Sequence, residues 1–132
     1  MIMSCLFIAD SKNRGRGVFS SEDLAAGTII ETAPVIVMSA EERVILDQTL
    51  LHDYIFLWGP DETQCCVALG YASIYNHDYL SNAEYEMDFE TDTIRIKTVR
   101  NINKGEEIFI NYNGNWDDST PVWFDRQSKI KQ

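Results

Sequence analysis

Leu69-Gly70-Tyr71-Ala72-Ser73-Ile74-Tyr75-Asn76-His77 is the stretch on which the interpretation of this chain depends. Further along, the segment 105–112 (GEEIFINY) predicts a turn followed by a buried strand that ends on Tyr112. A third segment, 15–19 (GRGVF), lies near the amino terminus and carries two glycines. An Asn-His pair, a strand ending in tyrosine and a Gly-x-Gly turn are each common. Their order and spacing in one short chain are informative.

The length and composition predict one folded domain over residues 1–132. The chain has 132 residues, of which 45% are hydrophobic and 11% aromatic, with no low-complexity stretch or internal repeat. Such a length supports one hydrophobic core but not a catalytic domain with a separate substrate-reading module. We therefore expect every functional residue to lie on a single fold.

The charge balance favours basic partners. The chain has 21 acidic and 11 basic residues, a formal net charge of −10. This disfavours direct binding to nucleic acid or to an anionic membrane, whereas a Lys-rich peptide would be attracted. The alternative is that the excess acid only keeps the protein soluble, and charge alone favours this simpler interpretation.

The sequence predicts an intracellular protein without a metal site. It has no run of about eighteen apolar residues, and its first residues lack the basic flank and cleavage site of a signal peptide. Its cysteines, Cys5, Cys65 and Cys66, are odd in number, and two are adjacent in an apolar run. Buried, reduced thiols are therefore expected rather than a disulfide framework or a zinc site.

Short apolar or alternating segments predict a mainly β fold. Glycines at 15 and 17 predict a tight turn before one of the strands, and Pro34 is expected at an edge or a bend, because proline has no N–H to donate. The expected strands are 3–9, 18–20, 28–32, 35–38, 54–58, 65–69 and 108–110.

One helix is predicted after the strand 35–38. Ser39 and Glu42 have the spacing of a capping box, in which each side chain bonds to the backbone N–H of the other residue. The helix is expected to run to about Leu51, where His52 and Asp53 interrupt the pattern. A short helical turn is expected at 70–75.

The strict alternation from Glu84 to Lys97 predicts a β-hairpin that turns at 90–93. In that register Asp88 faces Arg95 and Glu86 faces Lys97, which makes a row of cross-strand ion pairs. We interpret this row as mainly structural. The alternative is that its acidic edge also attracts substrate.

The three segments, in this order, resemble the SET-domain protein-lysine methyltransferases, and most closely small stand-alone virus-encoded or bacterial members. The resemblance covers nearly the whole chain. It implies the β-clip SET fold: several short antiparallel sheets, one or two short helices and a carboxyl-terminal pseudoknot. In that pseudoknot the last strand passes beneath the loop that holds Asn76 and His77, and so brings Tyr112 against the cofactor.

The resemblance implies an enzyme that transfers a methyl group from S-adenosylmethionine to a lysine in a basic protein tail, with S-adenosylhomocysteine as product and no metal. Histone tails are the best-known substrates of the family. One alternative is a catalytically silent SET-like module that binds a basic peptide. Retention of both Tyr112 and Asn76 argues against it, since a binding module needs neither. A structural β domain whose motifs match by accident is a third hypothesis.

The same resemblance places the cofactor on three segments. An amide such as that of Asn76 offers a donor and an acceptor without adding charge beside a sulfonium. His77 invites assignment as a base, but a lone histidine more often makes a fixed structural hydrogen bond, and the resemblance favours that interpretation. The residues expected to bind the cofactor are Gly15, Arg16, Gly17, Asn76, His77, Tyr112 and Trp116.

Tyr112 and Tyr54 are the expected catalytic residues. Methyl transfer to an amine is an in-line displacement, so the enzyme must align the reacting atoms rather than form a covalent intermediate. The lysine must also arrive neutral, which an apolar channel favours. Tyr54, Tyr71 and Tyr75 are the residues expected to line this channel.

The chain departs from the family pattern at a few positions. Asp78 and Ser81 stand where the family usually has Ser and Pro, and Asn113 precedes Gly114 after the last strand. No cysteine follows in the sequence, so a zinc-binding post-SET segment is not expected. Residues from about 115 to 132 are instead expected to close the site by packing Trp116, Trp123 and Phe124. A homodimer that completes the site is a further hypothesis.

Overall fold

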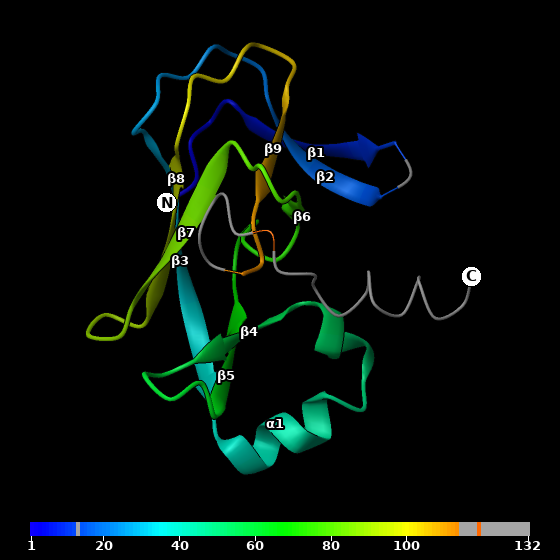
Figure 1. Ribbon diagram of the computed structural model, residues 1–132, viewed down its shortest axis with the longest axis vertical. Coiled ribbons are helices and arrows are strands. Elements are labelled where there is room, and N and C mark those ends of the chain that lie inside the picture. Colours follow the sequence, from blue (N-terminus) through cyan, green and yellow to red (C-terminus); the bar gives the residue numbers. More distant parts are fainter. Residues whose placement is uncertain (13, 114–118, 120–132) are drawn as a thin grey trace.

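The computed structural model describes residues 1–12, 14–113 and 119 and folds them into two β-sheets (Figure 1). The strand orders are β1-β2-β9-β6 and β4-β5-β3-β8-β7, and every pairing except that of β6 with β9 is antiparallel. The elements are β1 (Leu6–Ser11), β2 (Gly15–Ser20), β3 (Ile29–Met38), α1 (Ala40–Leu46), the 3₁₀ helix η1 (Leu50–Asp53), β4 (Ile55–Trp58), β5 (Gln64–Ala68), β6 (Asn76–His77), β7 (Ala83–Asp88), β8 (Thr93–Thr98) and β9 (Glu107–Ile110). The prediction of a mainly β fold with short antiparallel sheets is confirmed.

Strand β3 is continuous through Pro34, where two separate strands were predicted. Its first half pairs with β8, as far as Pro34 opposite Thr93, and its second half pairs with β5, beginning with Val35 opposite Ala68. Proline therefore lies where the strand exchanges one partner for another, and its carbonyl still accepts a bond from the Leu69 amide at 3.0 Å. The backbone N–H that proline lacks is therefore missing at the position where β3 changes partner strands, and its absence costs little stability there. In Figure 1, β3 runs from the upper sheet region toward α1.

Helix α1 begins as predicted but ends early. Both bonds of the capping box form: the Glu42 amide donates to Ser39 Oγ at 3.1 Å, and the Ser39 amide donates to Glu42 Oε1 at 3.0 Å. The helix ends at Leu46, not at Leu51. Thr49 explains the difference, because its hydroxyl donates to the Leu46 carbonyl and accepts from the amide of Leu51, which caps the separate 3₁₀ helix η1.

The hairpin β7–β8 forms with the predicted alternation, but its register differs by two residues from the predicted one. Asp88 faces Thr93 and Glu86 faces Arg95. The Asp88 carboxylate accepts the amides of Glu90 and Thr91, which closes the turn earlier than predicted. Arg95 still contacts Glu86 and Asp88, but as half-exposed pairs that contribute little stability.

The segment Gly15-Arg16-Gly17 is the start of β2 rather than the predicted turn. Gly15 faces Ser11 and has a φ of +71°, while Gly17 faces Ala9. A Cβ on Gly17 would collide with the Glu107 carboxylate. Glycine at this position therefore permits β2 to lie close to side chains of β6 and β9.

The parallel pairing of β6 with β9 joins the two motifs that are far apart in the sequence. Asn76 lies opposite Phe109, and His77 lies opposite Ile110. Asn82 supports this pairing because its amide donates to the Glu107 carbonyl at 2.8 Å and accepts from the Phe109 amide at 2.7 Å. The expected pseudoknot requires this contact, while the threading itself stays a prediction.

The core lies where the two sheets meet, and its centre is aliphatic. The buried residues there with exposures of 0 or 1% include Val18, Ile30, Ile94, Ile96, Ile102, Ile108 and Ile110. By contrast, no residue of α1 is buried. The stability of the fold therefore depends on the sheets and not on the helix.

Replacing a core isoleucine should destabilise the protein strongly. We expect Ile94→Ala to lower the free energy of unfolding by about 2–5 kcal/mol, because Ile94 is fully buried and the change leaves a cavity. Val44→Ala is the control: Val44 is 60% exposed on α1, and its loss should change the free energy of unfolding by less than about 0.5 kcal/mol. Urea unfolding measures both. Equal effects would contradict this assignment of the core.

Candidate active site

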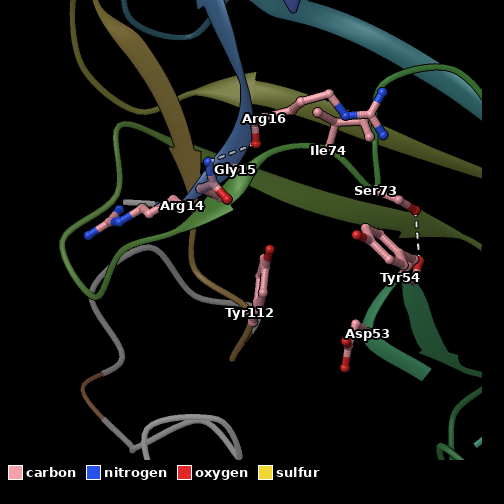
Figure 2. Close-up of a pocket in the computed structure, with 9 residues that line it drawn as sticks. Arg14, Gly15, Arg16, Asp53, Tyr54, Ser73, Ile74 and Tyr112 are labelled. Carbon is pink, nitrogen blue, oxygen red and sulfur yellow. Dashed lines mark hydrogen bonds between the residues drawn. The ribbon is translucent and has the colours of Figure 1, made fainter. Parts of the chain in front are cut away.

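A pocket lies where β2, β6 and the ends of η1 and β9 meet (Figure 2). It encloses about 430 Å³ of space, its open mouth included. The residues lining it are Arg14, Gly15, Arg16, Asp53, Tyr54, Ser73, Ile74, Asn76 and Tyr112. Five of these were predicted from the sequence as site residues: Gly15, Arg16, Tyr54, Asn76 and Tyr112.

Tyr112 is held in the pocket at three of its atoms. Its hydroxyl donates to the Tyr75 carbonyl at 2.8 Å, its backbone amide donates to His77 Nδ1 at 3.0 Å, and its carbonyl accepts from the Tyr85 hydroxyl at 3.2 Å. The residue nevertheless stays 36% exposed. Tyr112 is therefore oriented by the fold while its ring remains accessible from the pocket, with Tyr54 across from it in Figure 2.

The Tyr112 hydroxyl stays protonated over the physiological range. Desolvation is the main cause that raises the pKa of Tyr112 to about 12, with Tyr54 and Asp53 adding to the shift and the positive charge of Arg14 opposing it. A protonated phenol can donate one hydrogen bond and accept others, but it cannot act as an anionic base near neutral pH.

Asn76 is fixed by its neighbours from β2 and β9. Its amide nitrogen donates to Glu107 Oε2 at 2.8 Å and to the Arg16 carbonyl at 3.1 Å. The other carboxylate oxygen of Glu107 accepts from the hydroxyl of Ser11. Glu107 was not predicted as a site residue, and no sequence motif singled it out, since its role depends on the packing of β9 against β2.

The charged residues of the pocket are distributed unevenly. Arg14 and Arg16 flank Gly15 and point in opposite directions from it, Arg16 toward Ile74, whereas Asp53 lies beside Tyr54 (Figure 2). Arg14 is held by a bond to the His77 carbonyl at 3.1 Å and lies over the Phe109 ring, with its guanidinium carbon 4.9 Å from the ring centre. The pocket therefore has positive charge beside Gly15 and negative charge beside Tyr54.

His77 is a structural residue in this arrangement. It is buried, and its Nδ1 accepts the backbone amide of Tyr112. Its ring also lies 5.1 Å from the ring of Tyr112, centre to centre. His77 does not line the pocket, and Gly17 does not either. Both act on the pocket indirectly. His77 orients Tyr112, and Gly17 leaves space for the Glu107 side chain, which binds Asn76.

Two of the three expected channel tyrosines lie outside the pocket. The side chain of Tyr75 is in the core, with the residue 1% exposed, and its hydroxyl donates to Glu31 Oε1 at 2.8 Å. Tyr71 packs against the core and donates its backbone amide to Glu31 at 2.7 Å. Glu31, buried within β3, accepts hydrogen bonds from both residues and so holds this segment against the core. Only Tyr54 of the three lines the pocket.

Sequence reasoning missed Arg14, Asp53, Ser73 and Ile74 as pocket residues. Arg14 is next to Gly15 in the sequence, and Asp53 is next to Tyr54. This proximity to predicted site residues was the sequence feature that could have indicated them. Trp116, Trp123 and Phe124, expected to close the site, lie outside the described residues.

Within the described ranges, no three His, Cys, Asp or Glu residues are grouped to hold a metal, and no helix is long and apolar enough to cross a membrane. The three cysteines are free and buried.

Comparison with known proteins shows the family of this chain. Residues 15–113 match the SET domain family. A Schizosaccharomyces pombe protein named as a histone-lysine N-methyltransferase specific for H3 lysine-37 is 35% identical over 129 residues, which cover 97% of this chain and 82% of that protein.

Solved structures give the same result. A Plasmodium falciparum candidate histone methyltransferase matches with a TM-score of 0.65 and 29% identity, over 84% of this chain and 99% of that one. The Chaetomium thermophilum Polycomb Repressive Complex 2 bound to S-adenosylmethionine matches with a TM-score of 0.70, over 98% of this chain and 17% of that one. Its identity of 18% supports similarity of fold alone.

The fold and the site define a methyltransferase of the SET type, a class that uses S-adenosylmethionine. The chain belongs to the SET-domain family of protein-lysine methyltransferases and is a protein-lysine N-methyltransferase. The hypothesis of an accidental match is therefore wrong, and the catalytically silent alternative is not favoured.

The protonation of Tyr112 can be tested by ultraviolet absorbance. A tyrosine of ordinary pKa would be about three quarters ionised at pH 10.5, whereas Tyr112, with its pKa raised to about 12, should ionise there by only a few per cent. We therefore expect Tyr112→Phe to leave the native absorbance gain at 295 nm between pH 7 and 10.5 nearly unchanged.

The denatured proteins serve as the control, because in the denatured state the variant should lack the signal of one tyrosine.

The raised pKa also determines how the free energy of unfolding depends on pH. The folded state holds the Tyr112 proton more tightly than the unfolded state, so this contribution is complete below pH 10 and is lost as the pH rises toward about 12. A native difference of one full tyrosine at pH 10.5 would contradict the raised pKa.

Proposed function

We propose that this enzyme methylates a lysine in a basic histone tail, with histone H3 as the first substrate to test, and that the pocket described above holds both cofactor and lysine. The carrying observation is the oriented, protonated hydroxyl of Tyr112 in a pocket that also presents Tyr54 and groups of both charges. The name of the Schizosaccharomyces pombe relative, an H3 lysine-37 enzyme, supports the choice of H3.

The residues of the pocket fit S-adenosylmethionine. Gly15 lines the pocket, and a Cβ built on it meets nothing within 4 Å, so a side chain there would enter open space that a ligand can use. Arg14 and Arg16 suit the carboxylate of an amino-acid moiety, and Asn76 offers a neutral amide. Bound S-adenosylmethionine would supply an activated methyl group on a sulfonium.

In this proposal the chain contributes orientation rather than covalent chemistry. Tyr112 and Tyr54 flank the place where the amine and the methyl group must meet, and the Tyr112 hydroxyl, already donating to the Tyr75 carbonyl, can accept a bond from the amine. The half-exposed aromatic rings can pack along the apolar stem of a lysine. Excluding water from this space would favour the neutral amine that the transfer requires.

The charges of the pocket support a direction of entry for the substrate. Asp53 is the acidic residue among those that line the pocket, and Arg14 and Arg16 lie beside Gly15, away from Asp53 in Figure 2. A protonated lysine side chain is attracted to the first and repelled by the second. We therefore place lysine entry on the Asp53 side, and the cofactor carboxylate on the arginine side.

The direct experiment measures transfer of labelled methyl groups from S-adenosylmethionine to recombinant histone H3. Labelled H3 identifies the substrate, and an H3 variant with arginine in place of lysine-37 tests whether the site of the relative is shared. Calorimetric titration with S-adenosylmethionine is run alongside. Saturable cofactor binding without labelling of H3 would contradict the proposed substrate. Absence of cofactor binding would favour the alternative of a module that binds a basic peptide without catalysis. Intracellular location and a homodimer stay predictions, the second testable by sedimentation at several concentrations.

Tyr112→Phe should keep cofactor binding and lose turnover. We expect kcat to fall by on the order of 100-fold, since the ring remains but the hydroxyl that orients the amine is gone. The dissociation constant for S-adenosylmethionine should change little. Asn76→Ala is the contrasting variant: it should weaken cofactor binding itself. Unchanged kcat in Tyr112→Phe would contradict the role given to this hydroxyl.

Asp53→Asn should impair substrate capture more than chemistry. At low ionic strength we expect the KM for H3 to rise about two- to fivefold, the size of one exposed charge interaction, and this effect should shrink as salt screens it. Glu90→Gln is the matched control, because it removes one negative charge from the β7–β8 turn and not from the pocket. An equal rise of KM in both variants would assign the effect to net charge and contradict a specific role of Asp53.

A further inference from the structure

A buried carboxylate lies behind the active site and has no part in the pocket. Glu31, the third residue of β3, has an exposure of 0%. Its Oε1 accepts the Tyr75 hydroxyl at 2.8 Å, and its Oε2 accepts the Tyr71 amide at 2.7 Å. Burial of a charged group is unfavourable unless it is well paired, so the presence of Glu31 in the core calls for a physical reason.

Both bonds hold one segment, 70–76, which forms a wall of the pocket. Ser73 and Ile74 lie between the two donors and line the pocket. Gly70 permits the close approach, because it has a φ of +76° and a Cβ there would collide with Glu31 Oε2. Glu31 therefore holds the segment on both sides of its pocket-lining residues.

Tyr75 connects this carboxylate to Tyr112. Its ring points into the core and donates to Glu31, while its backbone carbonyl accepts the Tyr112 hydroxyl at 2.8 Å. Hydrogen bonds to a carbonyl oxygen are directional, so the position of this carbonyl determines where the Tyr112 hydroxyl points. The bond between Tyr75 and Glu31 in turn restricts the position of the carbonyl.

We propose that Glu31 and Tyr75 are positioning residues, which aim the Tyr112 hydroxyl through the Tyr75 carbonyl. This inference rests on the proposed role of Tyr112 in orienting the amine. Stability alone explains the pair poorly. Desolvation raises the pKa of Glu31 in spite of its bonds from Tyr71 and Tyr75, so the carboxylate form is disfavoured by its burial. A well-packed apolar residue would stabilise such a core at least as well.

The test uses Tyr75→Phe and Glu31→Gln, which keep the volume of each side chain. Protein labelled with [¹³Cζ]tyrosine reports the state of each hydroxyl, and the Tyr112 signal is assigned by its loss in Tyr112→Phe. We expect this signal to move in both variants. Its titration should begin at lower pH than in the wild type, because the neutral hydroxyl loses a well-placed acceptor. With S-adenosylmethionine and H3, kcat should fall about tenfold, with a smaller change in the KM for H3.

Ile94→Val is the matched control for lost stability, since Ile94 is fully buried and lies outside the pocket. It should lower the urea midpoint and leave both the Tyr112 signal and kcat as in the wild type. Glu31→Gln decides the question if Tyr75→Phe does not fold. A Tyr112 signal and kcat equal to the wild type in the folded variants would overturn the proposal, as would equal changes in Ile94→Val.

The outcome for this inference is separate from that for the proposed function. The tyrosine signal is recorded on the protein alone, without cofactor or substrate. A wild type that fails to methylate H3 would therefore refute the proposed substrate while the Tyr112 signal still decides the positioning. A wild type that methylates H3, with variants whose Tyr112 signal is unmoved, would refute the positioning alone.

Discussion

The parallel pairing of β6 with β9 is the contact on which the site depends. It brings Asn76 and His77 beside the strand that delivers Tyr112. A strand of two residues supplies few backbone bonds, so polar side chains provide the remaining support. The side chain of Asn82 forms hydrogen bonds with two backbone groups of β9, and the Glu107 carboxylate accepts a hydrogen bond from the side-chain amide of Asn76. Asn82 is buried, and Asn76 and Glu107 are partly buried, so leaving their polar groups unpaired would be costly, which makes the arrangement specific.

Local charge at the site differs from the charge of the whole molecule. The chain is strongly acidic, yet Arg14 and Arg16 line the pocket beside Gly15, and Asp53 lines it beside Tyr54. A ligand in a partly desolvated pocket interacts strongly with the charges next to it. Its interactions with distant surface charges are weakened by salt. In the proposed function, discrimination between a carboxylate and an ammonium therefore depends on these three side chains more than on net charge.

The predictions from sequence succeeded where short-range chemistry decides structure. The capping box of Ser39 and Glu42 and the alternation of β7 and β8 depend on residues close in the chain, and both formed. The errors arose where one side chain bonded to a nearby backbone group: the hydroxyl of Thr49 ended α1 early, and the Asp88 carboxylate moved the hairpin turn. Such side-chain bonds offer the backbone an alternative to the helix or the strand. The difference in free energy between the two is small, so a sequence pattern does not predict which one forms.

By itself, the sequence determined the family, the mainly β fold and the segments that build the pocket, because these follow from residue types in a characteristic order. Only the tertiary structure decided which tyrosine rings face the pocket and which face the core. Tyr54 and Tyr75 look alike in sequence, but the buried carboxylate of Glu31 accepts the hydroxyl of Tyr75 and leaves only its carbonyl for Tyr112. The direction of a side chain depends on partners from distant strands, which no local pattern contains.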